Sequence, residues 1–298
     1  MIKRIIYLGN PAYISTKLEQ LVIKQEEKVN TIPIEDIGVV ILDNSQITLT
    51  QTILYKLLEN NVALITCDNR HHPIGLQLVL ESNTLQSERF RAQIEASESL
   101  KKNLWQQTIQ SKIYNQAMVL HKFTEKPIEN MMYWSKSVLS GDTTNYEARA
   151  AAYYWENLLQ SHDNFKRERF GEYPNNFFNY AYAILRAITA RSLVASGLLP
   201  TLGIHHKNRY NAYCLADDIM EPYRPFADMI VLETIRKYPE QEELTKEIKA
   251  SLLGISVIDV KIDKITRPLQ IALQDTASSL SQCFEGSRRK IKYPKYYE

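Results

Sequence analysis

Two adjacent histidines, a cluster of acids and an arginine occur within about twenty residues of one another. The stretches are Gly203-Ile204-His205-His206, Asp217-Asp218-Ile219-Met220-Glu221 and Pro222-Tyr223-Arg224-Pro225. Imidazole and carboxylate together suit a borderline-to-hard divalent cation. An arginine beside such a site indicates an anionic substrate, because its planar fork matches phosphate or carboxylate. The segment therefore predicts a metal-assisted reaction on a phosphate ester.

The acidic cluster is compatible with a helix that presents its carboxylates together. Asp218 and Glu221 are three residues apart, so in a helix both would project from one face, and Asp217 lies on that side too. The alternative is a solvated acidic face that binds nothing. Pro222 disfavours α-helical geometry at the residue before it and removes a backbone donor. We therefore expect a kink or a restart of the helix there.

The histidine pair is a weak signal by itself. It follows Leu198-Leu199-Pro200-Thr201-Leu202-Gly203, which predicts a turn leading out of an apolar helix. Neutral imidazole is a common metal ligand, but paired histidines also occur by chance in loops. The patterns HxxxH and HExxH are absent from the sequence, so a zinc hydrolase is not supported.

Glu147 lies at the start of a predicted helix and has two alternative roles. Thr144-x-x-Glu147 fits a capping box in which Thr144 is the N-cap. On spacing alone this capping role is preferred over a role in chemistry. The sequence contains neither GxxxxGK[ST] nor GxGxxG, so a bound nucleotide cofactor or ATP hydrolysis is not supported.

The composition is that of a folded protein with no strong charge bias. The chain has 298 residues, of which 44% are hydrophobic and 23% charged, and its net charge is +2, so any nucleic-acid surface must come from local clusters. The three cysteines are far apart and lack CxxC spacing, which fits a reducing compartment. No apolar run approaches the ~20 residues needed to span a bilayer. We expect a cytoplasmic protein.

The hydrophobic periodicity changes along the chain and predicts two domains. Short β-branched runs bounded by turn residues predict strands at 5–8, 39–42, 47–50 and 62–66, with one helix at 52–59. Later segments have helical spacing, at 87–120, 145–159, 175–196, 241–253 and 269–284. We expect an α+β fold, in which a small N-terminal β-rich domain (1–82) precedes a larger all-α-helical domain (83–298) that carries the metal site.

The segment 286–297 is basic and rich in tyrosine. Its positive charges are Arg288, Arg289, Lys290, Lys292 and Lys295. A segment of this kind is either a solvated end or an arm that contacts phosphates, and the sequence leaves both open.

Taken together, these stretches resemble the CRISPR-associated spacer integrases, the larger of the two proteins shared by most CRISPR adaptation systems. The matching segments are 33–42, 62–68, 105–116, 147–155, 175–185 and 203–228. The strongest match is Asp218-Ile219-Met220-Glu221-Pro222-Tyr223-Arg224-Pro225. Arg169-Phe170-Gly171 resembles the type II branch, whose effector is a single large RNA-guided nuclease.

The resemblance implies a divalent metal site made by two acids and one histidine. Glu147 matches the first acid, although Ala148 stands where the family's Glu-Gly-x-Ala-Ala pattern has glycine. Glu221 matches the second acid. The family's histidine lies three residues after the glycine and fifteen before the second acid, which selects His206, with His205 as the fallback.

The resemblance also implies a secondary group of residues, a cofactor and partners. Asp218 matches an accessory acid, and this ligand set suits Mg²⁺ or Mn²⁺. The family assembles as a homodimer, and a small adaptation partner protein bridges two dimers. For this chain we expect dimerisation through the β-rich domain. We also expect contacts with other type II CRISPR proteins. The candidate DNA contacts are Arg224, Lys207, Arg209, Arg288, Arg289 and Lys290.

The implied reaction joins the 3′-hydroxyl ends of a protospacer to the CRISPR repeat in double-stranded DNA by transesterification. One ester bond replaces another, so no ATP is needed, which agrees with the missing phosphate-binding loop. Two alternatives are a metal-dependent nuclease that cuts branched or single-stranded DNA, and a non-catalytic DNA-binding scaffold.

Overall fold

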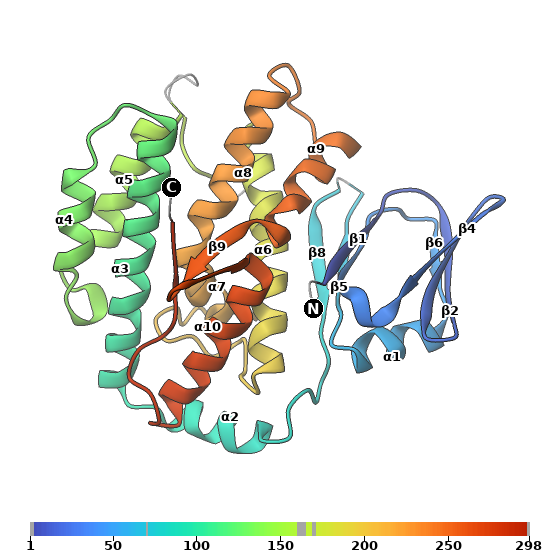
Figure 1. The fold of residues 1–298 in the computed structure, drawn as a ribbon, viewed down its shortest axis with the longest axis horizontal. Coiled ribbons are helices and arrows are strands. Elements are labelled where there is room, and N and C mark those ends of the chain that lie inside the picture. Colours follow the sequence, from blue (N-terminus) through green and yellow to red (C-terminus); the bar gives the residue numbers. More distant parts are fainter. Residues whose placement is uncertain (1–2, 70, 160–164, 169–170, 297–298) are drawn as a thin grey trace.

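A strand-rich N-terminal part lies beside a larger helical part (Figure 1). The computed structural model describes residues 3–69, 71–159, 165–168 and 171–296. Arg169 and Phe170, which carry part of the resemblance to the type II branch, lie outside the described residues.

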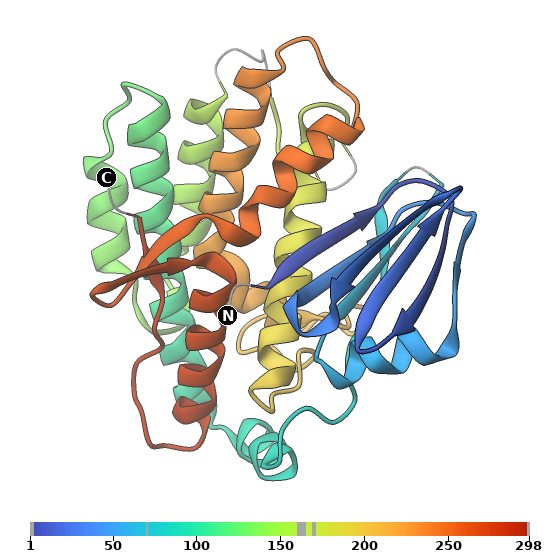
Figure 2. The same cartoon turned by 45° about the vertical axis from the view of Figure 1, so that its right-hand side comes forward.

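The N-terminal part is built from two four-stranded sheets and one helix (Figure 2). The first sheet has the order β1-β5-β7-β8 and the second has the order β4-β3-β2-β6. The elements are β1 (Arg4–Leu8), β2 (Ala12–Lys17), β3 (Gln20–Gln25), β4 (Lys28–Pro33), β5 (Ile37–Leu42), β6 (Ile47–Leu49), α1 (Gln51–Glu59), β7 (Ala63–Cys67) and β8 (Pro73–Gln77). The four predicted strands and the predicted helix are confirmed, while β2, β3, β4 and β8 were not predicted.

The first sheet is shared between two hydrophobic cores. Side chains alternate along a strand, and β5 is apolar throughout because both of its faces are covered. Val39 and Ile41 pack into the core of the helical part, whereas Ile37 and Val40 pack into the smaller core. The neighbouring strand β7 divides in the same way. This sheet therefore connects the two parts of the molecule through buried apolar contacts.

The helical part contains the helices that the periodicity predicted, with shifted ends, and others that it did not predict. The predicted helices correspond to α2 (Gln86–Glu95), α3 (Glu98–Phe123), α5 (Tyr146–Leu158), α6 (Asn175–Ala195), α9 (Lys246–Leu252) and α10 (Leu269–Phe284). The periodicity did not predict α4 (Glu129–Ser137), α7 (Cys214–Met220) or α8 (Arg224–Lys237). The predicted helix 87–120 is two helices, because Ser97 accepts a hydrogen bond from the backbone of Leu100 and caps a new start. Gly197 has a φ of 70° and ends α6 as predicted.

The expectation of an all-α-helical second domain is wrong. A three-stranded antiparallel sheet with the order β10-β9-β11 lies within it. The strands are β9 (Asp259–Ile262), β10 (Ile265–Pro268) and β11 (Pro294–Lys295). Val260 and Ile262 are buried while their neighbours on β9 are exposed, which is the alternation of a strand with one covered face. Asp263, at a φ of 55°, begins the reversal into β10.

The last described residues of the basic segment are packed. The backbone N–H of Ile291 donates to Gln107 of α3 (2.9 Å), and β11 pairs with β9. Tyr293 shares a hydrogen bond with Thr108 of α3 (2.8 Å). Residues 291–296 are therefore part of the helical domain's surface layer and not a free arm.

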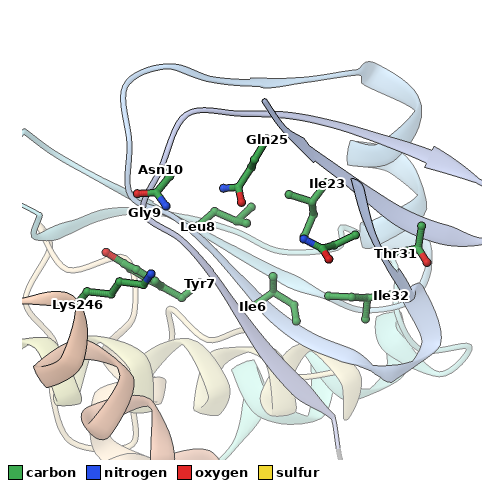
Figure 3. Close-up of a pocket in the computed structure, with 11 residues that line it drawn as sticks. Ile6, Tyr7, Leu8, Gly9, Asn10, Ile23, Gln25, Thr31, Ile32 and Lys246 are labelled. Carbon is green, nitrogen blue, oxygen red and sulfur yellow. The ribbon is translucent and has the colours of Figure 1, made fainter. Parts of the chain in front are cut away.

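A pocket of about 480 Å³ opens between β1, the hairpin of β3 and β4, and Lys246 of α9 (Figure 3). None of the residues that line it is a candidate site residue of the sequence analysis. None of the described helices combines the length and the apolar character needed to cross a membrane.

Candidate metal centre

Two of the predicted ligands meet at one lysine. Glu147 lies in the first turn of α5, and Glu221 begins the 3₁₀ turn η3 (Glu221–Tyr223) between α7 and α8. The Nζ of Lys112 on α3 is 2.8 Å from Glu147 Oε1 and 2.6 Å from Glu221 Oε2. Because both carboxylate oxygens contact one nitrogen, they lie within two hydrogen-bond lengths of each other. Helix α3 packs against both α5 and α8 (Figures 1 and 2).

The start of α5 is capped by Asp142, and not by the predicted box. The carboxylate of Asp142 accepts hydrogen bonds from the backbone N–H groups of Tyr146 and Glu147, each at 2.9 Å. Asn145 occupies the N-cap position in the left-handed conformation and makes no side-chain cap. Thr144 is therefore not the N-cap, and the capping box is wrong. Since the cap comes from elsewhere, the side chain of Glu147 is free to contact Lys112.

The restart at Pro222 orients Glu221. Helix α7 ends at Met220, and α8 begins at Arg224 after the 3₁₀ turn, as the proline predicted. The carbonyl of Pro222 accepts a hydrogen bond from the side chain of Asn115 on α3 (2.8 Å). Asn115 is buried and also donates to the carbonyl of Pro294 at 3.1 Å. The turn that carries Glu221 is thus held against α3 and against β11.

His206 is held by Asp218. Its Nδ1 lies 2.5 Å from Asp218 Oδ1, and the same carboxylate accepts from the backbone N–H of His205 (2.9 Å). A Cβ at Gly203 would lie 2.4 Å from the carbonyl oxygen of His206 and 2.7 Å from Asp218 Oδ2, so only glycine fits there. With Nδ1 facing the carboxylate, Nε2 of His206 is left for another partner.

The adjacent histidine has different surroundings. The ring of His205 stacks on Trp105 of α3, with centroids 4.1 Å apart and an interplanar angle of 1°. His206 meets the same indole edge-on at 5.7 Å. His205 therefore packs as an aromatic ring, while His206 has a polar contact on one nitrogen.

The charges of the site are coupled. Burial alone would lower the pKa of Lys112, but Glu221 and Glu147 outweigh it and raise that pKa above its ordinary value. Burial pushes the pKa of Glu221 upward, whereas Arg224 and Lys112 bring it below the usual value. The hydrogen bond with Asp218 is the main cause that raises the pKa of His206.

Arg224 borders the site on a second side. Its Nη2 is 3.1 Å from Glu221 Oε1, and its guanidinium lies 4.9 Å from the ring centre of Tyr182. The guanidinium of Arg167 lies 5.0 Å from the same ring. The hydroxyl of Tyr182 donates to Asp228, and Tyr154 donates to the other oxygen of that acid at 3.0 Å. This places two guanidinium groups around one tyrosine beside Glu221.

The other predicted DNA contacts lie on two separate segments. Lys207 and Arg209 follow His206 in the same loop, where Lys207 is exposed and pairs with Glu98 at 3.3 Å, and Arg209 lies over the ring of Tyr210. The remaining three lie between α10 and β11, and they are Arg288, Arg289 and Lys290. Asp217, which the spacing placed beside the ligands, instead pairs with Arg186 of α6 at 2.6 Å and 3.0 Å.

The sequence matches the family described as CRISPR associated protein Cas1 over residues 5–256. The CRISPR-associated endonuclease Cas1 of Neisseria meningitidis is 35% identical over 297 residues, which cover 98% of this chain and 95% of that protein. The chain belongs to the Cas1 family.

More distant proteins are similar to this Cas1 family member in sequence or in fold. The CRISPR-associated endonuclease Cas1 2 of Saccharolobus solfataricus is 27% identical over 243 residues, 76% of this chain and 73% of that protein. A solved casposase bound to integration product superposes with a TM-score of 0.83 at 18% identity, covering 99% of this chain and 94% of that chain. A Cas1 protein from Thermotoga maritima gives 0.76 at 14% identity, covering 99% and 100%.

The donor set fits a divalent cation, with Lys112 between the acids. Two carboxylates and an imidazole nitrogen are donors that Mg²⁺ or Mn²⁺ accepts. Glu221 Oε2 is buried, and within the described residues its ion contact with Lys112 is not accompanied by a well-directed hydrogen bond. Over residues 3–69, 71–159, 165–168 and 171–296, no three His, Cys, Asp or Glu side chains are grouped so that they could hold a metal ion as they stand.

The sequence analysis missed Lys112 as a member of the site. The periodicity predicted a helix over 87–120, and Lys112 lies among the buried residues of α3 within that range. A charged residue on an apolar helix face needs a buried partner, because an unpaired buried charge is costly. A lysine on a buried helix face therefore predicts a buried acidic partner, although spacing along the chain does not show which acid it is.

Proposed function

We propose that this Cas1 family member is a divalent-metal-dependent DNA integrase of CRISPR adaptation, which joins protospacer 3′-hydroxyl ends to the repeat. The observation that carries the proposal is the contact of Glu147 and Glu221 with the same lysine, Lys112. Asp218 orients His206 and raises its pKa, and both glutamates raise that pKa further. The name of the Neisseria relative, an endonuclease, supports chemistry on phosphodiesters. The likeness to the casposase supports the fold that such a reaction would use.

In the proposed mechanism, Glu147, Glu221 and His206 would hold Mg²⁺ or Mn²⁺. The bound cation would supply Lewis-acid stabilisation of charge on the attacking and leaving oxygens. The 3′-hydroxyl loses its proton as its oxygen forms a bond to the phosphorus at the leader–repeat junction. The bond to the departing 3′ oxygen breaks, and that oxygen takes up a proton, so ester bonds and protons balance. Asp218 keeps His206 in one orientation, and Arg224 offers N–H groups to a phosphate.

The proposed assembly follows the family. We infer a homodimer that works with a small adaptation partner protein on double-stranded DNA, in a type II system. Two solved structures with the same fold are titled Cas6-RT-Cas1–Cas2 complexes, and one of them superposes with a TM-score of 0.78, covering 100% of this chain and 36% of that chain. Their titles support a partner protein for this chain as well.

A strand-joining reaction tests the proposal. Purified protein, a labelled duplex with 3′-hydroxyl ends, a leader–repeat target and Mn²⁺ are combined, with and without the small partner protein. We expect Glu147→Ala, His206→Ala and Glu221→Ala each to lower joining by about 100-fold or more, since a metal's contribution is worth several kcal/mol. His205→Phe should retain joining, because a phenyl ring preserves the stack on Trp105.

Glu233→Ala is the matched control, because Glu233 forms an exposed ion pair with Lys122. Cleavage without joining, even with the partner present, would favour the nuclease that uses water as its nucleophile. DNA binding with neither activity, unchanged in the three variants, would instead leave a scaffold.

A further inference from the structure

Lys112 carries a positive charge at a buried position, where charged side chains are rare unless they are paired. It lies in the middle of the 26-residue helix α3, and only 10% of its side chain is exposed. Among the described residues it pairs with Glu147 and Glu221, and the latter side chain is only 4% exposed. Removing two carboxylates and an ammonium from water is costly, so each of these charges depends on the others.

The contacts of Lys112 use the oxygens that a metal ion would need. An ammonium has donors only and cannot be a metal ligand, and it carries one charge where a divalent cation carries two. It therefore competes with the cation for Glu147 Oε1 and Glu221 Oε2. A lysine suits this role because its flexible four-carbon stem lets the charge move without moving the helix.

We propose that Lys112 is an internal counter-ion, which holds the two glutamates together in the metal-free protein and which the divalent cation displaces. The inference rests on the proposed metal site and adds a residue that sets its affinity. Lys112 is a positioning residue, because it acts through Glu147 and Glu221. It stabilises the metal-free protein and weakens metal binding, since displacement of the ammonium opposes binding of the cation.

The variants Lys112→Met and Lys112→Gln, without DNA, test this. We expect Mn²⁺ to bind either variant at least tenfold more tightly than the wild-type chain in calorimetry, equivalent to about 1.4 kcal/mol. The Tm of the metal-free variants should be lower than that of the wild-type protein, because the half-buried Glu147 and the buried Glu221 both lose the positive charge of Lys112, which leaves Glu221 with Arg224. Saturating Mn²⁺ should remove most of this difference. Lys112→Arg should keep the metal-free stability.

Lys122→Met is the matched control, because Lys122 lies on the same helix in an exposed ion pair. Suppose that the wild-type chain binds Mn²⁺ and that Glu221→Ala does not. If Lys112→Met and Lys112→Gln then bind Mn²⁺ no more tightly than the wild-type chain, the counter-ion role is overturned and the proposed function stands. Wild-type protein that binds no Mn²⁺, or Glu221→Ala that binds it equally well, would overturn the metal site itself.

Discussion

Adjacent imidazoles at positions 205 and 206 face different surroundings in the folded chain. The ring of His205 lies flat on Trp105, whereas Nδ1 of His206 contacts Asp218. Counting residues favours His206 as the ligand, and the contact with Asp218 gives a physical reason for the same choice. A carboxylate on one ring nitrogen fixes the ring and increases the basicity of the other nitrogen.

A second buried acid gives a prediction about pH and stability. Burial raises the pKa of Asp228 to about 6, although Tyr182 and Tyr154 donate hydrogen bonds to it. The ordinary aspartate pKa is about 3.9, and the difference is equivalent to roughly 3 kcal/mol. Between these values the folded state binds more protons than the unfolded state, so stability should fall as pH rises from about 4 to about 6.

We therefore expect Asp228→Asn to remove this part of the pH dependence, while the wild-type chain loses stability over that range. The measurement is the free energy of unfolding from urea titrations at several pH values between 4 and 7. Parallel curves for the two proteins would contradict the raised pKa.

At the scale of elements, the segment from Gly203 to Arg224 carries the histidine and the second acid of the candidate centre. Its loop approaches α7 so closely that Gly203 has no room for a side chain. The turn η3 then restarts the helix and directs Glu221 toward α3. The turn at Gly203 and the restart of the helix at Pro222 each depend on one special residue, so the sequence could predict both.

We predict that Gly203→Ala displaces His206 and costs roughly 1–3 kcal/mol of stability, as overpacking typically does. The added methyl group would meet a backbone oxygen, which cannot rotate away. Thermal melts and the strand-joining assay measure the two effects. Gly254→Ala is the matched control, because a Cβ there has open space. Equal melting and joining by both variants would contradict the tight approach.

The sequence predicted the elements with clear periodicity and missed those that depend on distant partners. Strands with long apolar runs, such as β5, were found, but β4 is exposed along most of its length and has no readable alternation. Likewise β9 and β11 exist because segments far apart in the chain pair. The role of Lys112 depends on α5 and η3 meeting at α3, which spacing along one helix cannot reveal.

At the scale of the whole molecule, the shared sheet and a buried ion pair connect the two parts. Asp43 follows β5 and accepts hydrogen bonds from Tyr7 (2.6 Å) and from Lys249 of α9 (2.8 Å). The side chains of Asp43 and Lys249 are both buried. This contact joins the strand-rich part to the helical part beside the apolar contacts of Val39 and Ile41.

We predict that Lys249→Met destabilises the protein by about 3 kcal/mol, because it leaves Asp43 buried without its counter-charge. Combining it with Asp43→Asn should recover part of the loss, since no buried charge then remains. Urea unfolding of the single and double variants gives the two values. A double variant that is no more stable than Lys249→Met would show that the charge of Asp43 is not the cause.

Asn115 contacts both the turn η3 and the strand β11, and this matters for folding during translation. One buried amide, that of Asn115, donates to the carbonyl of Pro222 and to that of Pro294, and it accepts from the backbone of Tyr296. During translation, Glu147 and Glu221 are synthesised long before residues 294–296 emerge. The nascent chain therefore contains every proposed ligand while the amide that braces the turn of Glu221 is still incompletely satisfied.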